Sequence, residues 1–235
     1  MNMSKAERFD FYFSLAIVAI ILAVEIVAVF PAISAALLPT ESSYSGRYSE
    51  ANAALGSADV VFVGDSITDF WTKNGAFFPG QDYTNRGIAN ETTGKVLARF
   101  RQDVIELHPK TVVILAGIND LAVKSSTTES VTSNLRAMSE LARAHGIRVV
   151  LASLLPLGHG LDSGSRFVHA DLIPAINAWS RSYCAETGCS YLDYSSAMST
   201  PNGTMFADLT DDGLHPNAKG YAVMAPIAET TLDAN

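Results

Sequence analysis

Three residues of this sequence have side chains that can together carry out nucleophilic catalysis: Ser66, Asp212 and His215. A serine hydroxyl becomes a nucleophile when a base removes its proton, and an imidazole base works best when a carboxylate orients it. Asp212 and His215 are three residues apart, so one loop can present the carboxylate to one imidazole nitrogen and leave the other for Ser66. These residue types therefore predict acyl transfer through a covalent serine intermediate.

Acyl transfer also needs hydrogen-bond donors at the point where negative charge develops on the substrate oxygen. A glycine offers a backbone N–H without a side chain in the way, and an asparagine offers an amide N–H. Gly87 and Asn119 follow the second and third apolar runs of the chain and meet these two requirements. Together with the backbone N–H of Ser66, they are predicted to form an oxyanion hole.

Short apolar runs alternate with helical patterns from residue 58 onward, which is typical of an α/β fold. We expect strands at residues 58–63, 82–86, 111–116, 147–153 and 190–193. We expect helices at residues 92–107, 128–145, 169–187 and 217–232. The strands are apolar on both faces, as in a parallel sheet that is covered on each side. Polar residues follow the runs directly, where the chemistry of such sheets gathers.

Four short motifs give the chain a resemblance to the SGNH (GDSL-type) hydrolase family. In chain order they are Gly64-Asp65-Ser66, the glycine at 87, Gly117-Ile118-Asn119-Asp120, and the D-x-x-H spacing of residues 212–215. The resemblance covers nearly all of the chain from residue 58 onward, although Ile67 stands where leucine is usual. The G-x-S-x-G motif of α/β-hydrolases is absent, because Thr68 stands where its second glycine would be.

The resemblance implies a five-stranded parallel sheet in a three-layer α/β/α sandwich, similar to flavodoxin. It implies Ser66 as the nucleophile, His215 as general base and later acid, and Asp212 as the residue that orients the imidazole. Ser66, Gly87 and Asn119 would supply the oxyanion hole, and neither a metal ion nor an organic cofactor would be needed. The chain is similar in particular to PAF-acetylhydrolase-like and carbohydrate-esterase-like members.

Three further residues beside these motifs are candidates for the pocket: Asp65, Trp71 and Asp120. The two aspartates have short side chains that readily accept hydrogen bonds from loop backbone, so a structural role is favoured over direct catalysis. Trp71 is equally suited to form a pocket wall or part of the core.

An apolar stretch at residues 11–30 is long enough to cross a bilayer as a helix, with Glu25 as its one charge. Lys5 and Arg8 precede the stretch, and the next basic residue is Arg47. The positive-inside bias therefore places the rest of the chain outside the cytoplasm, in the periplasm or the medium.

We expect residues 1–39 to be an uncleaved signal anchor that binds the membrane, or alternatively a cleaved signal peptide with small residues at 32–34. Residues 40–57 are expected to form a linker and a leading helix. The hydrolase domain is expected to span residues 58–235.

The formal net charge of −8 argues against a nucleic acid partner, since phosphate binding needs an excess of Lys and Arg. Cys184 and Cys189 lack the further Cys or His neighbours of a zinc site, so no metal is expected. The two cysteines form a disulfide in an oxidising compartment or stay unpaired, and their spacing does not decide between these alternatives.

Placement outside the cytoplasm and the family resemblance together favour a small O-acyl group, such as acetyl, on a glycan or lipid as the substrate. The segment 155–168 after the fourth strand is short, which leaves little room for a lid over long acyl chains. A lysophospholipase, a thioesterase or an O-acyltransferase would use the same residues and stays open. A non-catalytic, membrane-tethered binding domain is the remote alternative, because it would need neither Ser66 nor His215.

Overall fold

The structure is a computed structural model that describes residues 46–159, 161 and 166–234. The predicted signal segment, residues 1–39, lies outside the described residues, and so do residues 40–45 of the predicted linker and leading helix. Residues 43–235 form one compact unit. Within the part of the chain that the structure describes, no helix is both long and apolar enough to span a bilayer.

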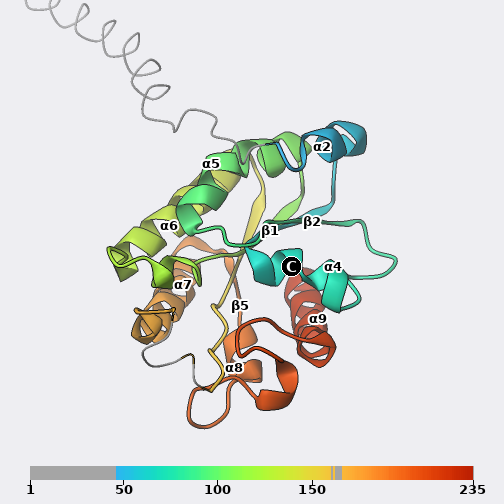
Figure 1. Cartoon of the computed structure of the whole chain (residues 1–235). Helices are drawn as coiled ribbons and strands as arrows, with labels where there is room; N and C mark the ends of the chain where they lie inside the picture. Colours follow the sequence, from blue (N-terminus) through green and yellow to red (C-terminus); the bar gives the residue numbers. More distant parts are fainter. Residues whose placement is uncertain (1–45, 160, 162–165, 235) are drawn as a thin grey trace, which may run out of the picture. The chain divides into compact units, whose positions relative to one another are not determined.

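A five-stranded parallel sheet forms the centre of this unit (Figure 1). Its strands lie in the order β2-β1-β3-β4-β5, and every pair of neighbours is parallel. The strands are Val60–Gly64 (β1), Tyr83–Gly87 (β2), Thr111–Leu115 (β3), Arg148–Ala152 (β4) and Ser190–Leu192 (β5). β1 and β3 are buried along their whole length, as their continuous apolar runs predict for strands covered on both faces.

Helices cover both faces of the sheet (Figure 1). The helices of one face pack side by side in chain order and are α5 (Thr93–Asp103), α6 (Thr128–Ala144) and α7 (Ile173–Thr187). The other face carries α3 (Ser66–Asp69), α4 (Trp71–Asn74), α8 (Tyr194–Met198) and α9 (Ala218–Asp233). The predicted three-layer α/β/α sandwich with a five-stranded parallel sheet is therefore confirmed.

The expected element boundaries hold to within a few residues, with two differences. The helices expected at 92–107 and 169–187 are each divided into an α-helix and a 3₁₀ turn, Ile105–Leu107 and Ala170–Leu172 respectively. Further 3₁₀ turns are Asp120–Ala122 and Ala207–Leu209. Short 3₁₀ turns are frequent at helix ends, where the last backbone groups lack helical partners.

Trp71 belongs to the hydrophobic core. Its side chain is 1% exposed and stacks on Tyr221 of α9 with ring centroids 5.0 Å apart. Phe62 of β1 and Phe78 complete the aromatic layer around it. Of the two roles that the sequence left open for Trp71, the structure therefore favours the core, because the first turn of α4 faces β1 and α9 rather than solvent.

Asp65 caps the short helix that starts at Ser66. Its Oδ1 accepts a hydrogen bond from the backbone N–H of Ile67 at 3.0 Å, which is the loop-backbone contact favoured for this residue type. The side chain is 1% exposed, and Oδ2 has no hydrogen-bond partner among the described residues. Burial raises the pKa of Asp65 to about 7, although the Ile67 hydrogen bond opposes the shift.

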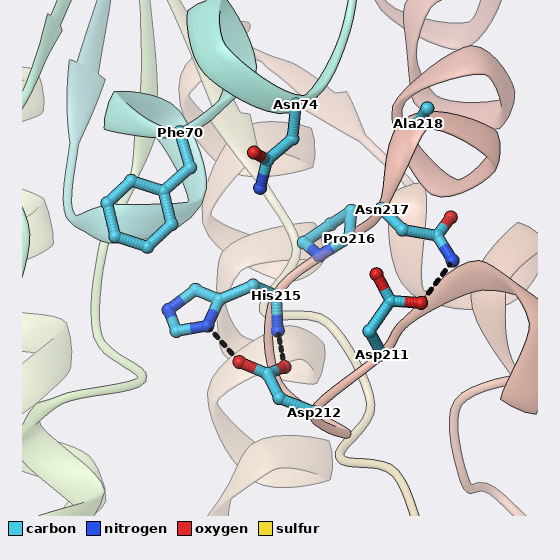
Figure 2. A pocket seen from close by; sticks show the side chains of 8 residues that line it. All are labelled: Phe70, Asn74, Asp211, Asp212, His215, Pro216, Asn217 and Ala218. Carbon is cyan, nitrogen blue, oxygen red and sulfur yellow. Dashed lines mark hydrogen bonds and ion pairs between the residues drawn. The ribbon is translucent and has the colours of Figure 1, made fainter.

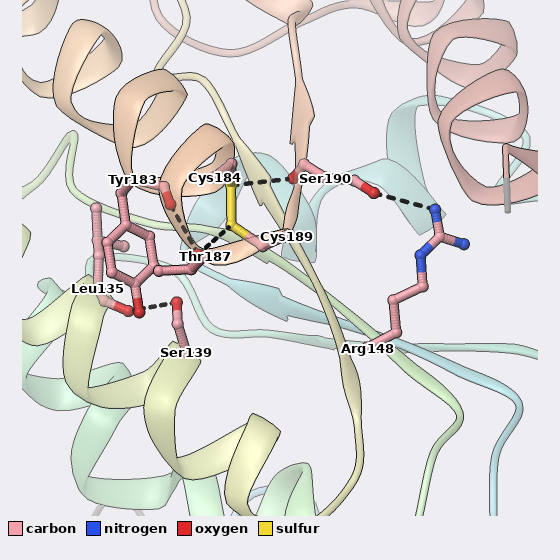
Figure 3. Close-up of a disulfide and its surroundings, with 8 residues drawn as sticks. All are labelled: Leu135, Ser139, Arg148, Tyr183, Cys184, Thr187, Cys189 and Ser190. Atoms are coloured by element: carbon pink, nitrogen blue, oxygen red, sulfur yellow. Dashed lines mark hydrogen bonds between the residues drawn. A yellow bond between two sulfur atoms is a disulfide. The ribbon is translucent and has the colours of Figure 1, made fainter.

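Cys184 and Cys189 form a disulfide where α7 leads into β5 (Figure 3). Gly188 lies between them at φ +76° and ends α7, as expected of a C-terminal glycine. The bond fastens the residue directly before β5 to the last turn of α7. The disulfide that the sequence left open is thus present in the structure.

The segment before β1 is packed against the sheet edge. It contains helix α2 (Ser49–Leu55) at the place of the predicted leading helix. The Arg47 guanidinium donates to both Asp69 carboxylate oxygens at 2.9 and 2.8 Å, and the Tyr48 hydroxyl donates to the Gly87 carbonyl. Asn52 donates to Asp103 of α5 at 2.7 Å. These contacts fix residues 46–52 to α3, β2 and α5.

Asp65→Asn is expected to remove a pH dependence of stability. The folded chain holds the Asp65 proton up to a pKa of about 7, whereas the unfolded chain releases it near the ordinary value of 3.8. The free energy of unfolding of the wild type should therefore fall as the pH rises from about 4 to about 7, and then stay level. Asparagine keeps an acceptor for Ile67 but carries no charge, so the variant should be more stable above about pH 7 by roughly 2–4 kcal/mol.

Urea unfolding followed by circular dichroism at about pH 4 and about pH 8 measures this difference. Asp59→Asn is the matched control, because the Asp59 carboxylate is half-exposed and pairs with Lys110 at the surface. It should change stability little at either pH. A wild type more stable than Asp65→Asn at the higher pH would contradict the prediction.

Candidate active site

Ser66, His215 and Asp212 lie in one line of hydrogen bonds. Ser66 is the first residue of α3, and the other two belong to the loop before α9. The Ser66 hydroxyl Oγ is 2.9 Å from His215 Nε2, and His215 Nδ1 is 2.6 Å from Asp212 Oδ2. Figure 2 shows the contact between the imidazole and the carboxylate. The structure thus brings together the three residues that the sequence singled out.

The second oxygen of Asp212 is occupied by the loop itself. Oδ1 accepts the backbone N–H groups of Leu214 at 2.9 Å and of His215 at 2.8 Å. Partial burial opposes ionisation, but these bonds and the one from the imidazole outweigh it and lower the pKa of Asp212 to about 2. Asp212 is therefore a carboxylate at neutral pH, and its Oδ2 accepts a hydrogen bond from the Nδ1–H of His215. Nε2 is then the nitrogen that can accept the hydroxyl proton of Ser66.

Further contacts hold the imidazole and the backbone of His215 in place. The Phe70 ring lies against it with ring centroids 4.9 Å apart, and the Thr210 hydroxyl donates to the His215 carbonyl at 2.8 Å. Asp211, the neighbour of the orienting carboxylate, instead accepts from the Asn217 amide at 3.2 Å. The geometry therefore pairs His215 with Asp212 and leaves Asp211 beside the cap of α9.

Gly87 does not have the free N–H that was expected of it. Its N–H donates to Asn85 Oδ1 at 2.8 Å. A glycine stands here for a steric reason, because a Cβ atom would lie 2.1 Å from the backbone nitrogen of Asp69. The expectation that Gly87 supplies an oxyanion donor is therefore corrected: this residue allows α3 to lie directly against the end of β2.

Asn90, in the loop that follows β2, has an N–H without an acceptor among residues 46–159, 161 and 166–234. The preceding N–H groups are taken, that of Ile88 by the Gly64 carbonyl at 3.0 Å and that of Ala89 by Asp69 Oδ2 at 3.2 Å. Asn90 has φ +65°, a left-handed conformation that asparagine tolerates better than most residues. Within the described residues its N–H meets no acceptor. The sequence does not single out Asn90, because a free backbone N–H is expected first of a glycine.

Asn119 presents an amide whose orientation is fixed. Its Nδ2 donates one hydrogen to the Glu91 carbonyl at 3.0 Å, which leaves the second hydrogen for another acceptor. Its Oδ1 lies 3.4 Å from Nη2 of Arg166, and the same nitrogen is 3.2 Å from Asn90 Oδ1. Arg166 therefore links the two asparagines on either side of the site.

Asp120 fastens α5 to the loop after β3. Its carboxylate accepts the backbone N–H of Thr93 at 2.8 Å and the Thr93 hydroxyl at 2.6 Å. Burial raises the pKa of Asp120, although the bonds from Thr93 oppose the shift. The contact with loop backbone favoured from the sequence is present, and it turns the side chain away from solvent.

A surface hollow of about 340 Å³ opens beside His215 (Figure 2). Asp65, Trp71 and Asp120 do not line it, and all three are buried. The suggestion that they belong to the pocket is therefore corrected, because each is used for capping or packing behind the site. The hollow is lined by Phe70, Asn74, Asp211, Asp212, His215, Pro216, Asn217 and Ala218.

No group of three or more His, Cys, Asp or Glu residues that could hold a metal ion occurs within residues 46–159, 161 and 166–234. The arrangement described above needs none for its chemistry. A hydroxyl, a base oriented by a carboxylate and nearby N–H donors suffice for acyl transfer.

The sequence model of the GDSL-like lipase/acylhydrolase family matches residues 62–223. The chain is also similar to a crystal structure of a GDSL-like lipase from Bacteroides thetaiotaomicron, with a TM-score of 0.73 and 31% sequence identity. That match covers 81% of this chain and 97% of the lipase.

Two curated relatives are also similar to the chain. An arylesterase of Vibrio mimicus is 28% identical over 156 residues, which are 65% of this chain and 72% of the arylesterase. The uncharacterized lipoprotein YqeF of Bacillus subtilis is 32% identical over 114 residues. That match covers 43% of this chain and 47% of the lipoprotein, so the chain spans about half the length of this relative. The chain is a member of the GDSL-like lipase/acylhydrolase family and a carboxylic ester hydrolase, as its resemblance to the SGNH (GDSL-type) hydrolases predicted.

Proposed function

We propose that this protein is a serine esterase that removes short acyl groups, such as acetyl, from hydroxyl groups of a glycan. The observation that carries the proposal is the unbroken contact from Asp212 through His215 to Ser66, with distances of 2.6 and 2.9 Å. In this geometry the Ser66 hydroxyl is activated while its protonated base is stabilised by a carboxylate.

The reaction proceeds in two steps. His215 Nε2 takes the proton of Ser66 as Oγ attacks the ester carbonyl, and the resulting imidazolium is stabilised by Asp212. The tetrahedral intermediate collapses when His215 protonates the leaving alcohol, which leaves the acyl group on Ser66. Water, deprotonated by His215, then attacks the acyl-enzyme and releases the carboxylic acid.

The oxyanion of each intermediate is bound by the backbone N–H of Ser66, the backbone N–H of Asn90 and the remaining amide hydrogen of Asn119. Asn90 takes the place that was predicted for Gly87. Support comes from the neighbouring backbone, because the N–H groups of Gly87, Ile88 and Ala89 already donate to acceptors within the protein. Donors that are oriented before the reaction stabilise the developing charge without reorganisation.

The hollow beside His215 favours a small, neutral and hydroxylated substrate. It is open, about 340 Å³ in volume, and its lining combines the Asn74 and Asn217 amides with two carboxylates. No Lys or Arg is among its lining residues. Asp211 and Asp212 in the lining of the hollow would repel a lipid phosphate, although Arg166 lies beside Asn90 and Asn119. The lining of the hollow therefore suits a glycan ester better than a lysophospholipid.

We further propose that the enzyme works outside the cytoplasm and is attached to the membrane through residues 1–39. The Cys184–Cys189 disulfide supports this placement, because such bonds persist in oxidising compartments. The apolar run at residues 11–30 supports the attachment, and one relative is named a lipoprotein.

Ser66→Ala should abolish hydrolysis of p-nitrophenyl acetate, because no hydroxyl remains to form the acyl-enzyme. Asp212→Asn should lower kcat by about 10²–10⁴-fold, since the imidazole loses the partner that sets its tautomer. Asp211→Asn is a matched control one residue away and should leave kcat within about threefold. Release of nitrophenolate measures all three variants. Equal losses at positions 211 and 212, or an active Ser66→Ala, would refute the assignment.

Asn119→Ala should lower kcat by about 10²–10³-fold with little change in KM, because one oxyanion donor is removed. Asn134→Ala serves as the control, since Asn134 is partly buried and its amide donates to the Thr93 hydroxyl on α5. Steady-state kinetics with p-nitrophenyl acetate measure both variants. A loss confined to KM would assign Asn119 to substrate binding instead.

Activity should decline with acyl length. The open hollow contains no long apolar channel in the part of the chain that the structure describes, so a longer chain gains little burial. The value of kcat/KM should fall from acetyl through butyryl to octanoyl nitrophenyl esters at fixed pH. A rise with chain length would contradict the short-acyl preference and favour a lipase.

A further inference from the structure

A buried ionic cluster lies behind the active site, and the proposed reaction does not use it. Its centre is Arg99 of α5, which is 2% exposed. Glu91, in the loop after β2, is 0% exposed, and Asp103, one helical turn after Arg99, is 1% exposed. Because burying charges is costly, and replacing such clusters by apolar residues is often neutral or stabilising, a contribution to stability does not by itself account for this cluster.

The guanidinium of Arg99 spreads its donors over three partners. Nε donates to Glu91 Oε2 at 2.6 Å, and Nη1 donates to Asp103 Oδ2 at 2.9 Å. Nη2 donates to the backbone carbonyl of Gly64 at 3.0 Å. A planar guanidinium with fixed donor directions can hold three groups in one geometry, which a lysine ammonium cannot do.

Two of these partners lie directly beside the proposed oxyanion donors. Gly64 ends β1, two residues before Ser66. Glu91 follows Asn90, and its backbone carbonyl accepts the Asn119 amide at 3.0 Å. Each of the three donors is therefore connected to a residue that Arg99 contacts: the Ser66 N–H to Gly64 through two peptide bonds, the Asn90 N–H to Glu91 through one, and the Asn119 amide to Glu91 through a hydrogen bond.

We propose that Arg99 is the positioning residue of the oxyanion hole. Its guanidinium connects the end of β1 to the loop after β2 and so sets the separation of the Ser66 N–H from the donors of Asn90 and Asn119. The inference rests on the proposed function. Small displacements of such donors weaken transition-state stabilisation far more than they weaken substrate binding.

Asp103 offers a control within the same cluster. It contacts Arg99 on the side away from the site, and its other oxygen accepts from Asn52 of α2. Asp103→Asn removes a buried charge from the cluster but leaves the contacts of Arg99 with Gly64 and Glu91 in place. A role in stability alone predicts similar kinetics for variants at 99 and 103, whereas a positioning role predicts different kinetics.

The experiment compares the full-length wild type with Arg99→Met, Arg99→Lys and Asp103→Asn, with p-nitrophenyl acetate as substrate. Arg99→Met should lower kcat by about 100-fold with KM within about threefold. Arg99→Lys should recover part of the loss, and Asp103→Asn should keep kcat within about threefold. Circular dichroism melting identifies the temperatures at which each variant is fully folded, and kinetics are measured there.

A folded Arg99→Met with kcat within about threefold of the wild type overturns the proposal, and so does an equal loss of kcat in Asp103→Asn. If Arg99→Met does not fold, Arg99→Lys decides: a loss of at least about tenfold in kcat supports the role, and a smaller one overturns it. Labelling of Ser66 by a fluorophosphonate separates two failures. A wild type that is not labelled overturns the proposed function together with this inference, whereas a labelled wild type beside a fully active Arg99→Met overturns only the positioning role.

Discussion

The register between β1 and its two neighbours fixes the level at which three loops leave the sheet. Gly64 of β1 lies opposite Gly87 of β2 and Leu115 of β3. The next residues of each strand therefore emerge together, and they include Ser66, Asn90 and Asn119. A shift of register by one residue would turn every side chain of a strand to the other face. Such a shift would separate the Ser66 hydroxyl from the N–H donors of Asn90 and Asn119.

Close backbone approach maintains this arrangement. A Cβ on Gly64 would lie 2.1 Å from the Leu115 carbonyl oxygen, and one on Gly87 would lie 2.1 Å from the Asp69 nitrogen. The absence of side chains at these two positions lets α3 start directly above the sheet. The hydroxyl of Ser66 then reaches His215, which approaches from the far end of the sequence. Two carboxylates near the site are paired with arginines: Asp69 of α3 with Arg47, and Glu91 with Arg99.

Much of this architecture could be predicted from residue pattern alone. Continuous apolar runs identified the strands, since a strand covered on both faces has no polar side. The pairing of Asp212 with His215 was predictable because both residues lie in one short loop. The role of Gly87 was not, because the sequence does not reveal whether a glycine serves close packing or leaves an N–H accessible. The left-handed backbone of Asn90 and the burial of Arg99 depend on contacts made across the fold.

The contacts of Arg47 and Tyr48 indicate where the N-terminal boundary of the catalytic domain lies. A boundary drawn at the first strand, near residue 58, separates the catalytic loops from the guanidinium that binds Asp69 through both oxygens. Asp69 in turn accepts the N–H of Ala89, next to the proposed oxyanion donor. Arg47, which precedes that boundary, therefore supports the loop beside the active site through Asp69. Shortened forms of the protein, and fusions to other domains, keep the contact of Arg47 with Asp69 only if their junction lies ahead of residue 46.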